Sequence, residues 1–434
     1  MRGIIWLAML VAILSATSSS AQEAGSTPPS PLEPLILQLG HKDYRIREAA
    51  GKQLEARGEQ ALPILRKSLS QSDPEIRRRL AVLMQKIERQ VLLSPKLITL
   101  DVDKRPFKEV IDEVARQSGY RIHLENQVMQ NVTLKVKDVT FWEVMDRLCL
   151  EGGLVIGGDD GDNTLRLFQQ DTYSPFIAYT GPFRIMATNM HSNRTVNLAF
   201  LPRRAIENQQ PPEGLTFTFQ INGEPKSSLL GIGMPILTKA EDQNGQTLMF
   251  KEDDPNNPYR VGYAPQNYYR ATQMQSQLSL TRPSRQSTRA KMIAAKLPVM
   301  ILAEARPEVT VENILKVKNA KYHGQTVDVD VESVADNNGD VQITLSIRRL
   351  GKNVVQDDNW ANSVFQRLEL TDAKGKRFPS QGINNFINSS PAHIQAVFQF
   401  GKQADLGPPA KLVYHHWVMM NHEIEFEFKD MPLP

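Results

Sequence analysis

The sequence predicts a multidomain α+β protein, in which a short α-helical segment and a βαββαββ module precede two tandem antiparallel β domains. Three observations lead to this prediction. Apolar residues recur with a helical period over 32–93, helix and strand periods alternate over 95–170, and period-two alternation dominates thereafter. Within that last part, AKLPVMILAEARPEVTVENI at 295–314 and AKLVYHHWVMMNHEIEFEFK at 410–429 match in one register. We therefore expect a tandem duplication with its copies at 172–313 and 314–434.

The first 21 residues have the order of a secretory signal peptide. Arg2 precedes the apolar run Ile4–Leu14, and small and hydroxylated residues lead to Ala21. The run is shorter than the roughly 20 residues that span a bilayer, so an uncleaved membrane anchor is the less favoured alternative. We expect cleavage after Ala21, export to the periplasm or beyond, and no transmembrane segment in the mature chain. Residues 22–31 are rich in Gly, Ser, Thr and Pro and predict a disordered linker.

Composition places the chain among ordinary globular proteins. A formal net charge of +3 over 434 residues gives no argument for nucleic acid as a partner. Cys149 is the single cysteine, so the chain forms no internal disulfide and depends on packing for its stability. Because Cys149 lies on an apolar helix face, we expect a buried, unreactive thiol rather than a reactive one.

Four helices are expected over 32–93, because apolar residues recur there every three or four positions. Two of them begin alike: DYRIR from Asp43 is echoed by DPEIR from Asp73, and each aspartate is expected to cap its helix. The segment resembles HEAT-type helical repeats, whose repeated helix carries an Asp at its start and an Arg one turn later. Two such repeats do not close a core alone, so the resemblance implies a cap that leans on its neighbours.

This helical segment is also the most basic part of the chain, and Arg77, Arg78 and Arg79 stand in a row. Two interpretations stay open. The arginines form either a solvated helix face or a surface that binds an acidic partner. All three are therefore candidate partner-binding residues.

Residues 95–170 predict the element order β-α-β-β-α-β-β. Phe107 and Phe141 fall on the inner faces of its two helices, and Thr140 with Glu143 is expected to form a capping box. The stretches LITLDVDKRPFKEVIDEVARQSGYRIHLE and NVTLKVKDVTFWEVMDRLCLEGGLVI are similar to the secretin and TonB short N-terminal (STN) domain. That family is a periplasmic docking module without catalytic residues, so the resemblance implies protein contact in the cell envelope. The part that follows does not resemble a secretin pore or an outer-membrane barrel.

Each copy of the duplicated part predicts an antiparallel, immunoglobulin-like β-sandwich. Strands with alternating apolar residues are expected at 195–200, 215–221, 327–331 and 341–347. The match between the copies extends to two turns, AEDQNGQ around Asp242 and TDAKGKR around Asp372. The end of the chain alternates glutamates with apolar residues over Glu423–Phe428, which predicts a strand with one buried and one solvent face.

The first copy is longer than the second between the turn and the Ala-Lys-Leu strand. Asp242 and Ala295 are 53 positions apart and Asp372 and Ala410 are 38, a difference of 15. We expect an inserted loop at about 250–290. Its aromatic and basic residues favour recognition surfaces, although a merely disordered loop is the competing interpretation. The candidate partner-binding residues there are Tyr259, Arg260, Tyr263, Tyr268, Tyr269 and Arg270.

The sequence offers no reactive constellation. It contains no Gly-x-Ser-x-Gly elbow, no phosphate-binding Gly-Lys-Ser/Thr loop and no His-Glu-x-x-His pair. His415 and His416 are neighbours on an expected strand and point to opposite faces, so no metal site is predicted there. The acidic turn at 159–163 lacks the glutamate that closes a calcium loop. Neither a catalytic residue nor a cofactor or metal is expected.

Three hypotheses of function follow from these patterns. The first is a non-catalytic exported protein that binds or scaffolds other proteins or polymers of the envelope. The second is an accessory component of an envelope secretion or transport apparatus, which rests on the short N-terminal domain resemblance. The third is an uncharacterised hydrolase, which requires a clustered acid, base or nucleophile in the folded chain.

Overall fold

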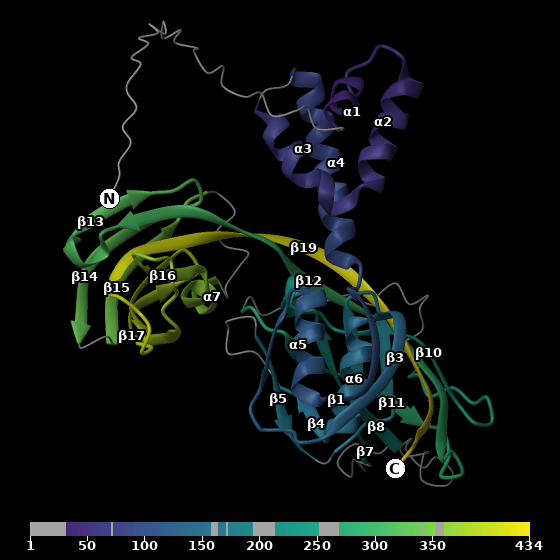
Figure 1. Cartoon of the computed structure of the whole chain (residues 1–434). Coiled ribbons are helices and arrows are strands. Elements are labelled where there is room, and N and C mark those ends of the chain that lie inside the picture. Colours follow the sequence, from purple (N-terminus) through teal and green to yellow (C-terminus); the bar gives the residue numbers. More distant parts are fainter. Residues whose placement is uncertain are drawn as a thin grey trace, which may run out of the picture. The chain divides into compact units, whose positions relative to one another are not determined.

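The computed structural model describes residues 32–70, 73–157, 164–170, 172–193, 213–250, 269–337, 340–351 and 360–434. The expected signal peptide at 1–21, the expected linker at 22–31, the acidic turn at 159–163 and the strand expected at 195–200 lie outside these residues. The chain divides into two compact units, Met1–Ile87 and Glu88–Pro434, which we describe separately. The described residues confirm a multidomain α+β chain with helices and antiparallel strands in several sheets (Figure 1). They contain no helix with the length and apolar character needed to cross a bilayer.

The first unit is built from helices at the predicted positions. They are α1 (Glu33–Gln38), α2 (Tyr44–Ala56), the short 3-10 helix η1 (Gly58–Ala61), α3 (Leu62–Leu69) and α4 (Pro74–Leu93), whose last turns belong to the second unit. Both predicted caps form: Asp43 Oδ1 accepts from the N–H of Arg45 at 2.8 Å, and Asp73 Oδ1 from that of Glu75 at 2.9 Å. Most leucines of the apolar stripes are buried, Leu54, Leu65 and Leu80 fully, whereas Leu32, Leu35 and Leu69 are partly buried.

The second unit starts with the predicted βαββαββ order. Its elements are β1 (Leu97–Pro106), α5 (Phe107–Ser118), β2 (Arg121–Leu124), β3 (Asn131–Thr140), α6 (Phe141–Gly152), β4 (Leu154–Ile156) and β5 (Thr164–Gln169). β1 pairs with β3, and β5 lies between β2 and β4, parallel to β2. Gly119 and Gly153 end the two helices with φ of 76° and 60°, the left-handed conformation that glycine adopts most easily.

The predicted capping box of α6 is wrong. Thr140 makes no side-chain cap bond, and its buried hydroxyl has no hydrogen-bond partner among the described residues. The reason is that Thr140 is still part of β3 and pairs with Leu97, while the N–H of Phe141 donates to the carbonyl of Lys96 at 2.8 Å. Strand pairing, rather than a local cap, fixes the start of this helix.

Replacing either inner-face phenylalanine with alanine is expected to destabilise this module by about 3–5 kcal/mol, because the loss of a buried ring leaves a cavity. Phe107 and Phe141 are 1% and 0% exposed. Urea unfolding followed by Trp142 fluorescence measures the effect. Phe386→Ala, at a half-exposed position, is the matched control and is expected to change stability little. Equal effects at all three positions would contradict the packing described.

The remaining strands form three groups. The first sheet has the order β11-β8-β7-β6, from β6 (Ile177–Thr180), β7 (Phe183–Asn193), β8 (Glu213–Gly223) and β11 (Gln273–Arg282). The second has the order β13-β14-β15-β18-β17, from β13 (Ala320–His323), β14 (Val327–Asn337), β15 (Asp340–Arg349), β17 (Ser380–Ser390) and β18 (His393–Phe400). The third runs β10-β12-β19-β16 with β9 beside β12, from β9 (Leu229–Ile232), β10 (Ile236–Asp242), β12 (Arg289–Glu312), β16 (Leu368–Asp372) and β19 (Pro409–Pro432).

The two matched sequence stretches have matching strand neighbours. β12 pairs with β10, as β19 pairs with β16, and β11-β8-β7-β6 follows the same order as β18-β15-β14-β13. The two turns agree as well: Asp242 Oδ1 accepts from backbone N–H groups two and four residues further on, at 2.9 and 2.8 Å, and Asp372 Oδ1 does so at 2.8 and 2.9 Å. Gly245 and Gly375 both have φ of 79°.

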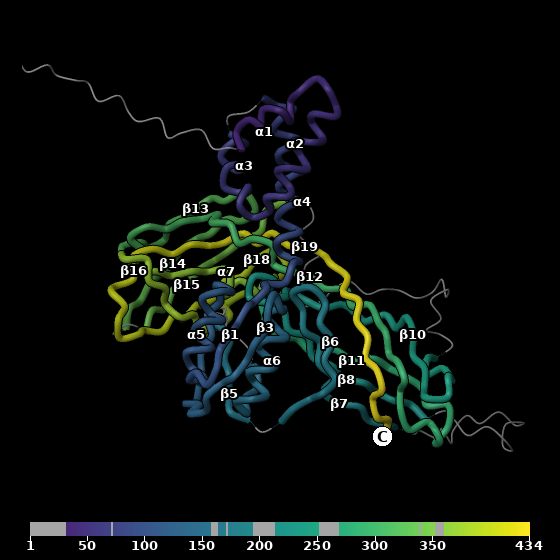
Figure 2. Tube along the Cα trace, turned by 45° about the vertical axis from the view of Figure 1, so that its right-hand side comes forward, coloured from purple at the N-terminus to yellow at the C-terminus, as the bar shows by residue number. Residues whose placement is uncertain are grey.

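The two longest strands, β12 and β19, lie side by side (Figures 1 and 2), antiparallel over almost their whole length. Each has 24 residues, which corresponds to about 80 Å of extended chain and exceeds what one core needs. The first half of β12 is buried in the first β core with Ile293 and Leu297, and its end reaches the second core with Val309 and Val311. The first half of β19 is buried in the second core with Leu412 and Tyr414, and its end is buried in the first core.

The expected boundary between residues 313 and 314 therefore does not separate the two cores, because β12 and β19 each contribute residues to both. Ile424, Phe426 and Phe428, at the end of the chain, are buried in the first core against Phe217 and Phe219 of β8. The alternation over Glu423–Phe428 is confirmed, because the glutamates of that stretch are exposed. Period-two alternation identifies the buried face of a strand but says nothing about the strand that pairs with it.

The expected loop at about 250–290 is also corrected. Residues 251–268 lie outside the described part, but Gln273–Arg282 forms β11 and pairs with β8 without a register shift. Met274, Leu278 and Leu280 alternate into the first core. Glutamine and serine at the intervening positions weaken the strand signal, because they are typical of loops as well as of solvent-facing strand positions.

Candidate functional site

A pocket of about 450 Å³ lies between α2 and α4 in the first unit. Eight of its twelve lining residues are charged: the lining consists of Leu39, Arg47, Glu48, Gly51, Lys52, Glu55, Glu75, Arg78, Arg79, Val82, Leu83 and Lys86. We call it the helical groove. On each helix the lining residues are three or four positions apart, and this spacing places side chains on one face of a helix.

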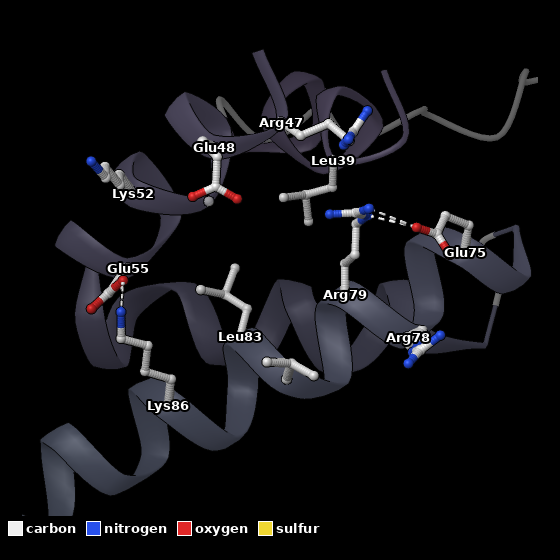
Figure 3. A pocket seen from close by; sticks show the side chains of 12 residues that line it. Leu39, Arg47, Glu48, Lys52, Glu55, Glu75, Arg78, Arg79, Leu83 and Lys86 are labelled. Carbon is white, nitrogen blue, oxygen red and sulfur yellow. Dashed lines mark hydrogen bonds and ion pairs between the residues drawn. The ribbon is translucent and has the colours of Figure 1, made fainter. Parts of the chain in front are cut away.

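The floor and rim of the helical groove differ in character. Leu39 and Leu83 are buried between the helices, as Figure 3 shows, whereas the side chain of Val82 is 64% exposed. Two ion pairs lie at the rim. Arg79 and Glu75 pair within α4 at 2.7 Å, and Lys86 of α4 pairs with Glu55 of α2 at 2.8 Å. The two charges of each pair cancel, and such solvent-accessible ion pairs contribute little to the stability of the fold.

The helical groove keeps an excess of positive charge. Its lining holds five basic and three acidic side chains, a net charge of +2. Within the described part of the chain, Lys52 and Arg78 make no hydrogen bond or ion pair. Arg47 Nη1 donates to the carbonyls of His41 and Lys42 at 2.8 and 3.0 Å, while its buried Nε has no partner among the described residues. The arrangement therefore favours an acidic ligand with some apolar surface.

The predicted arginines separate in the structure. Arg78 and Arg79 line the helical groove, whereas Arg77 is exposed on α4 and does not line it. Sequence reasoning missed Lys52 and Arg47 as members of the same site, although their spacing on α2 matches that of a helix face. Only the packing of α2 against α4 brings the two sets of charges together.

Of the predicted tyrosine and arginine cluster, Tyr269 and Arg270 belong to the described residues. Tyr259, Arg260, Tyr263 and Tyr268 lie outside the described residues. The side chain of Tyr269 is 43% exposed.

Arg270 has a different environment from the exposed one expected for a recognition residue. Its backbone N–H donates to Gln366 Oε1 at 2.6 Å, and its Nε donates to Ser228 Oγ at 3.2 Å. Arg270 is thus partly buried and ties the segment before β11 to helix α7 (Trp360–Arg367).

Buried acidic groups of the second unit hold the fold together. Glu224 is fully buried and accepts from the hydroxyl of Tyr120 at 2.6 Å and the N–H of Lys96 at 3.0 Å. Burial raises the pKa of Glu224, although the Tyr120 hydrogen bond and the charge of Lys226 oppose the rise. These contacts join the βαββαββ module to the loop after β8.

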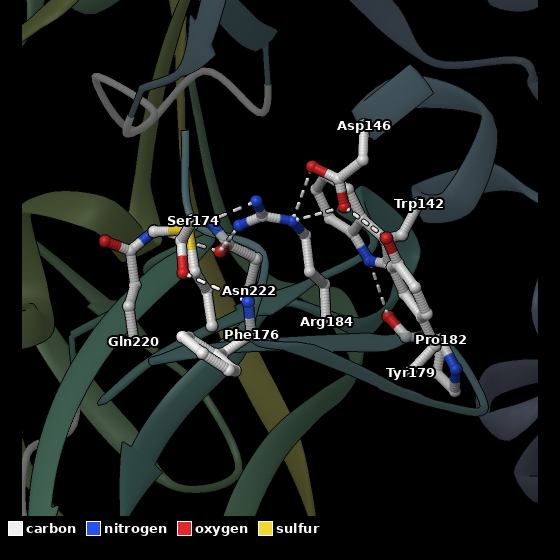
Figure 4. Close-up of polar contacts among 10 residues, drawn as sticks. Trp142, Asp146, Ser174, Phe176, Tyr179, Pro182, Arg184, Gln220 and Asn222 are labelled. Carbon is white, nitrogen blue, oxygen red and sulfur yellow. Dashed lines mark hydrogen bonds and ion pairs between the residues drawn. The ribbon is translucent and has the colours of Figure 1, made fainter. Parts of the chain in front are cut away.

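A second buried pair lies between α6 and β7. Arg184 Nε donates to both oxygens of Asp146 at 2.9 and 2.7 Å, and the Tyr179 hydroxyl donates to Asp146 Oδ2 at 2.7 Å (Figure 4). Burial and the adjacent Asp146 raise the pKa of Tyr179, so its hydroxyl stays a donor. Cys149, one turn further along α6, is buried as predicted, and burial raises the pKa of its thiol to about 12.

The neighbouring histidines His415 and His416 of β19 face different carboxylates. His415 faces Glu369 at 3.5 Å and His416 faces Glu308 at 3.8 Å. No group of three or more His, Cys, Asp or Glu side chains in the described ranges is arranged to hold a metal ion.

Comparison with known proteins adds little. No protein-family model matches the chain, and no curated protein matches it. One solved structure, "The crystal structure of the conserved domain protein from Bacillus anthracis", is 10% identical over 58% of this chain and 90% of that chain, with a TM-score of 0.15. A TM-score at this level carries no argument about fold or function.

Proposed function

We propose that this chain is a non-catalytic, exported binding or scaffolding protein of the cell envelope, and that the helical groove takes an acidic segment of a protein partner. The observation that carries this proposal is the groove's net charge of +2 with Lys52 and Arg78 unengaged by any described residue. Exposed Val82 beside buried Leu83 supplies apolar surface for the same segment. Acidic motifs bind clusters of basic side chains in this way.

The buried ionisable groups of the second unit support the same proposal. Asp146 and Glu224 are engaged by hydrogen bonds from Arg184, Tyr179 and Tyr120, so their charges fasten elements of the fold to one another. A catalytic acid or base needs access to a substrate proton, and these two carboxylates are occupied by neighbouring side chains.

A second candidate function is an accessory role in an envelope secretion or transport apparatus. The observation that favours it is the element order from β1 to β5, which is the order expected for a short N-terminal docking domain. In the same proposal, α1–α4 are paired HEAT-type helices and the two β cores are tandem immunoglobulin-like sandwiches that arose by duplication. The shared strand order and the matching turns at Asp242 and Asp372 support the duplication.

The groove is tested by the binding of a labelled peptide that alternates Glu with Leu, measured by fluorescence anisotropy on the purified full chain. Lys52→Glu combined with Arg78→Glu is expected to weaken binding by about tenfold or more, equivalent to about 1.4 kcal/mol. Raised salt is expected to weaken wild-type binding, because exposed charges are screened. The same peptide with Lys in place of Glu is expected not to bind.

Arg77→Glu combined with Lys67→Glu is the matched control. It makes the same change of charge in the same unit, at positions that do not line the groove. Its binding is expected to stay close to that of the wild type. Equal weakening by both double variants would show that net charge, and not the groove, attracts the peptide.

A further inference from the structure

A second pocket, of about 310 Å³, lies in the second unit where α6 faces β7 and β8. No sequence pattern predicts this pocket, and it shares no lining residue with the helical groove. Its polar wall contains Asp146, Gln170, Thr172, Tyr173, Arg184 and Gln220. We call it the α6 pocket. Its volume is at the small end of the range for ligand sites, roughly 300–1,000 Å³.

A rigid, buried frame forms the back of the α6 pocket. Arg184 is 6% exposed, and its position is fixed by Asp146 on one side and by Asn222 Oδ1, 3.3 Å from Nη1, on the other. Figure 4 shows the guanidinium extended between these two side chains. Among the described residues, Nη2 donates only to the sulfur of Met186, at 3.3 Å. Because a thioether is a weak acceptor, Arg184 keeps donor capacity beside the pocket.

Hydrogen-bonding capacity is also unused elsewhere on the wall. Gln220 Nε2 donates to Asn222 Oδ1 at 3.0 Å, which leaves Gln220 Oε1 without a described partner. The side chains of Gln170, Thr172 and Tyr173 make no hydrogen bond with any described residue. All of these groups are amides or hydroxyls, which offer both donors and acceptors.

The α6 pocket is electrically neutral, because the charges of Asp146 and Arg184 are paired within its frame at 2.7 Å. A charged ligand therefore gains nothing there from net attraction and loses its hydration. Apolar surface completes the site: Leu150 is 57% exposed, Ile156 and Ile177 are partly buried, and the Tyr173 side chain is 60% exposed.

We propose that the α6 pocket binds a neutral sugar residue of a glycan. Sugar hydroxyls both donate and accept, which matches the mixed amides and hydroxyls of the wall, and the C–H face of a sugar ring packs on apolar and aromatic side chains such as Leu150 and Tyr173. A peptide is the less favoured ligand. The two edge strands that line the pocket, β4 and β6, have only three and four residues, too few for a peptide to add as a paired strand.

The probes are tetramers of N-acetylglucosamine, of α-1,4-linked glucose and of β-1,4-linked glucose, with acetyl-tetra-alanine amide as the peptide probe. Each is titrated into the full chain by isothermal titration calorimetry. At least one saccharide is expected to bind and the peptide is not. Tyr173→Ala and Gln170→Ala are expected to weaken saccharide binding by about tenfold. Both residues are exposed, so neither change is expected to disturb the fold.

Tyr269→Ala is the matched control, because it removes another exposed tyrosine from the same unit outside the α6 pocket. It is expected to bind saccharide like the wild type. Binding by no saccharide, binding by the peptide alone, or equal loss in the Tyr173 and Tyr269 variants would each overturn the proposal. The Lys52→Glu, Arg78→Glu variant is expected to keep saccharide binding, so the helical groove and the α6 pocket succeed or fail separately.

Discussion

A chain that ends after Trp417 is expected to lose the first β core while it keeps the second. The missing residues include Ile424, Phe426 and Phe428, which are 0%, 5% and 3% exposed and are packed in the first core. Truncation of a single buried Ile or Phe costs about 2–5 kcal/mol. The unfolding free energy of a typical domain is about 5–15 kcal/mol. The combined cost of losing all three side chains therefore exceeds the stability of a domain at the lower end of that range.

Hydrogen–deuterium exchange of the two cores measures this effect. Amides of β8, such as those of Phe217 and Phe219, are expected to exchange rapidly in the truncated chain. Amides of β15, such as those of Ile343 and Leu345, serve as the internal control, because their core keeps the first half of β19. If the β8 amides stay fully protected from hydrogen exchange after the truncation, the end of β19 is not an essential part of the first core, which would contradict the packing described.

The second large effect is expected at the buried pair between α6 and β7. Arg184→Ala or Asp146→Ala alone is expected to cost about 3–5 kcal/mol, because each leaves the other charge buried without its partner. The side chains are 7% and 12% exposed, so solvent screens the pair little. The double variant is expected to cost less than the sum of the single changes.

Urea unfolding followed by Trp142 fluorescence reports on this pair directly, because Trp142 donates from Nε1 to the carbonyl of Pro182 at 3.0 Å beside it. Lys135→Ala is the control, since the Lys135–Asp101 pair is 81% and 72% exposed and is expected to contribute little. Additive losses in the Arg184, Asp146 double variant would show that the two side chains do not act as a pair.

Local signals in the sequence predicted local structure well. The helical period placed the inner faces of α5 and α6, and the buried Phe107 and Phe141 confirm both. Asp43 and Asp73 cap the helices that they were expected to cap, because a cap depends only on residues within one turn. The matching turns at Asp242 and Asp372 are local in the same sense.

Features that depend on distant residues were not predictable in this way. The pairing of β12 with β19 joins residues such as Ala295 and Phe426, and no periodicity identifies a partner so far along the chain. The α6 pocket depends on Asp146 and Arg184, which are 38 positions apart and belong to different elements. The sequence predicted only part of the helical groove. Arg78 belongs to a run of three consecutive arginines, whereas Lys52 belongs to no such run.

The location of the partner is tested most directly by site-specific photo-crosslinking with the acidic peptide. Benzoylphenylalanine is placed at Val82, which is 64% exposed and lines the helical groove, and in a second chain at Leu37, which is 71% exposed and does not line it. A crosslink from position 82 that is absent from position 37, and that is lost in the Lys52→Glu, Arg78→Glu background, is the predicted result. Equal crosslinking from both positions would contradict binding in the groove.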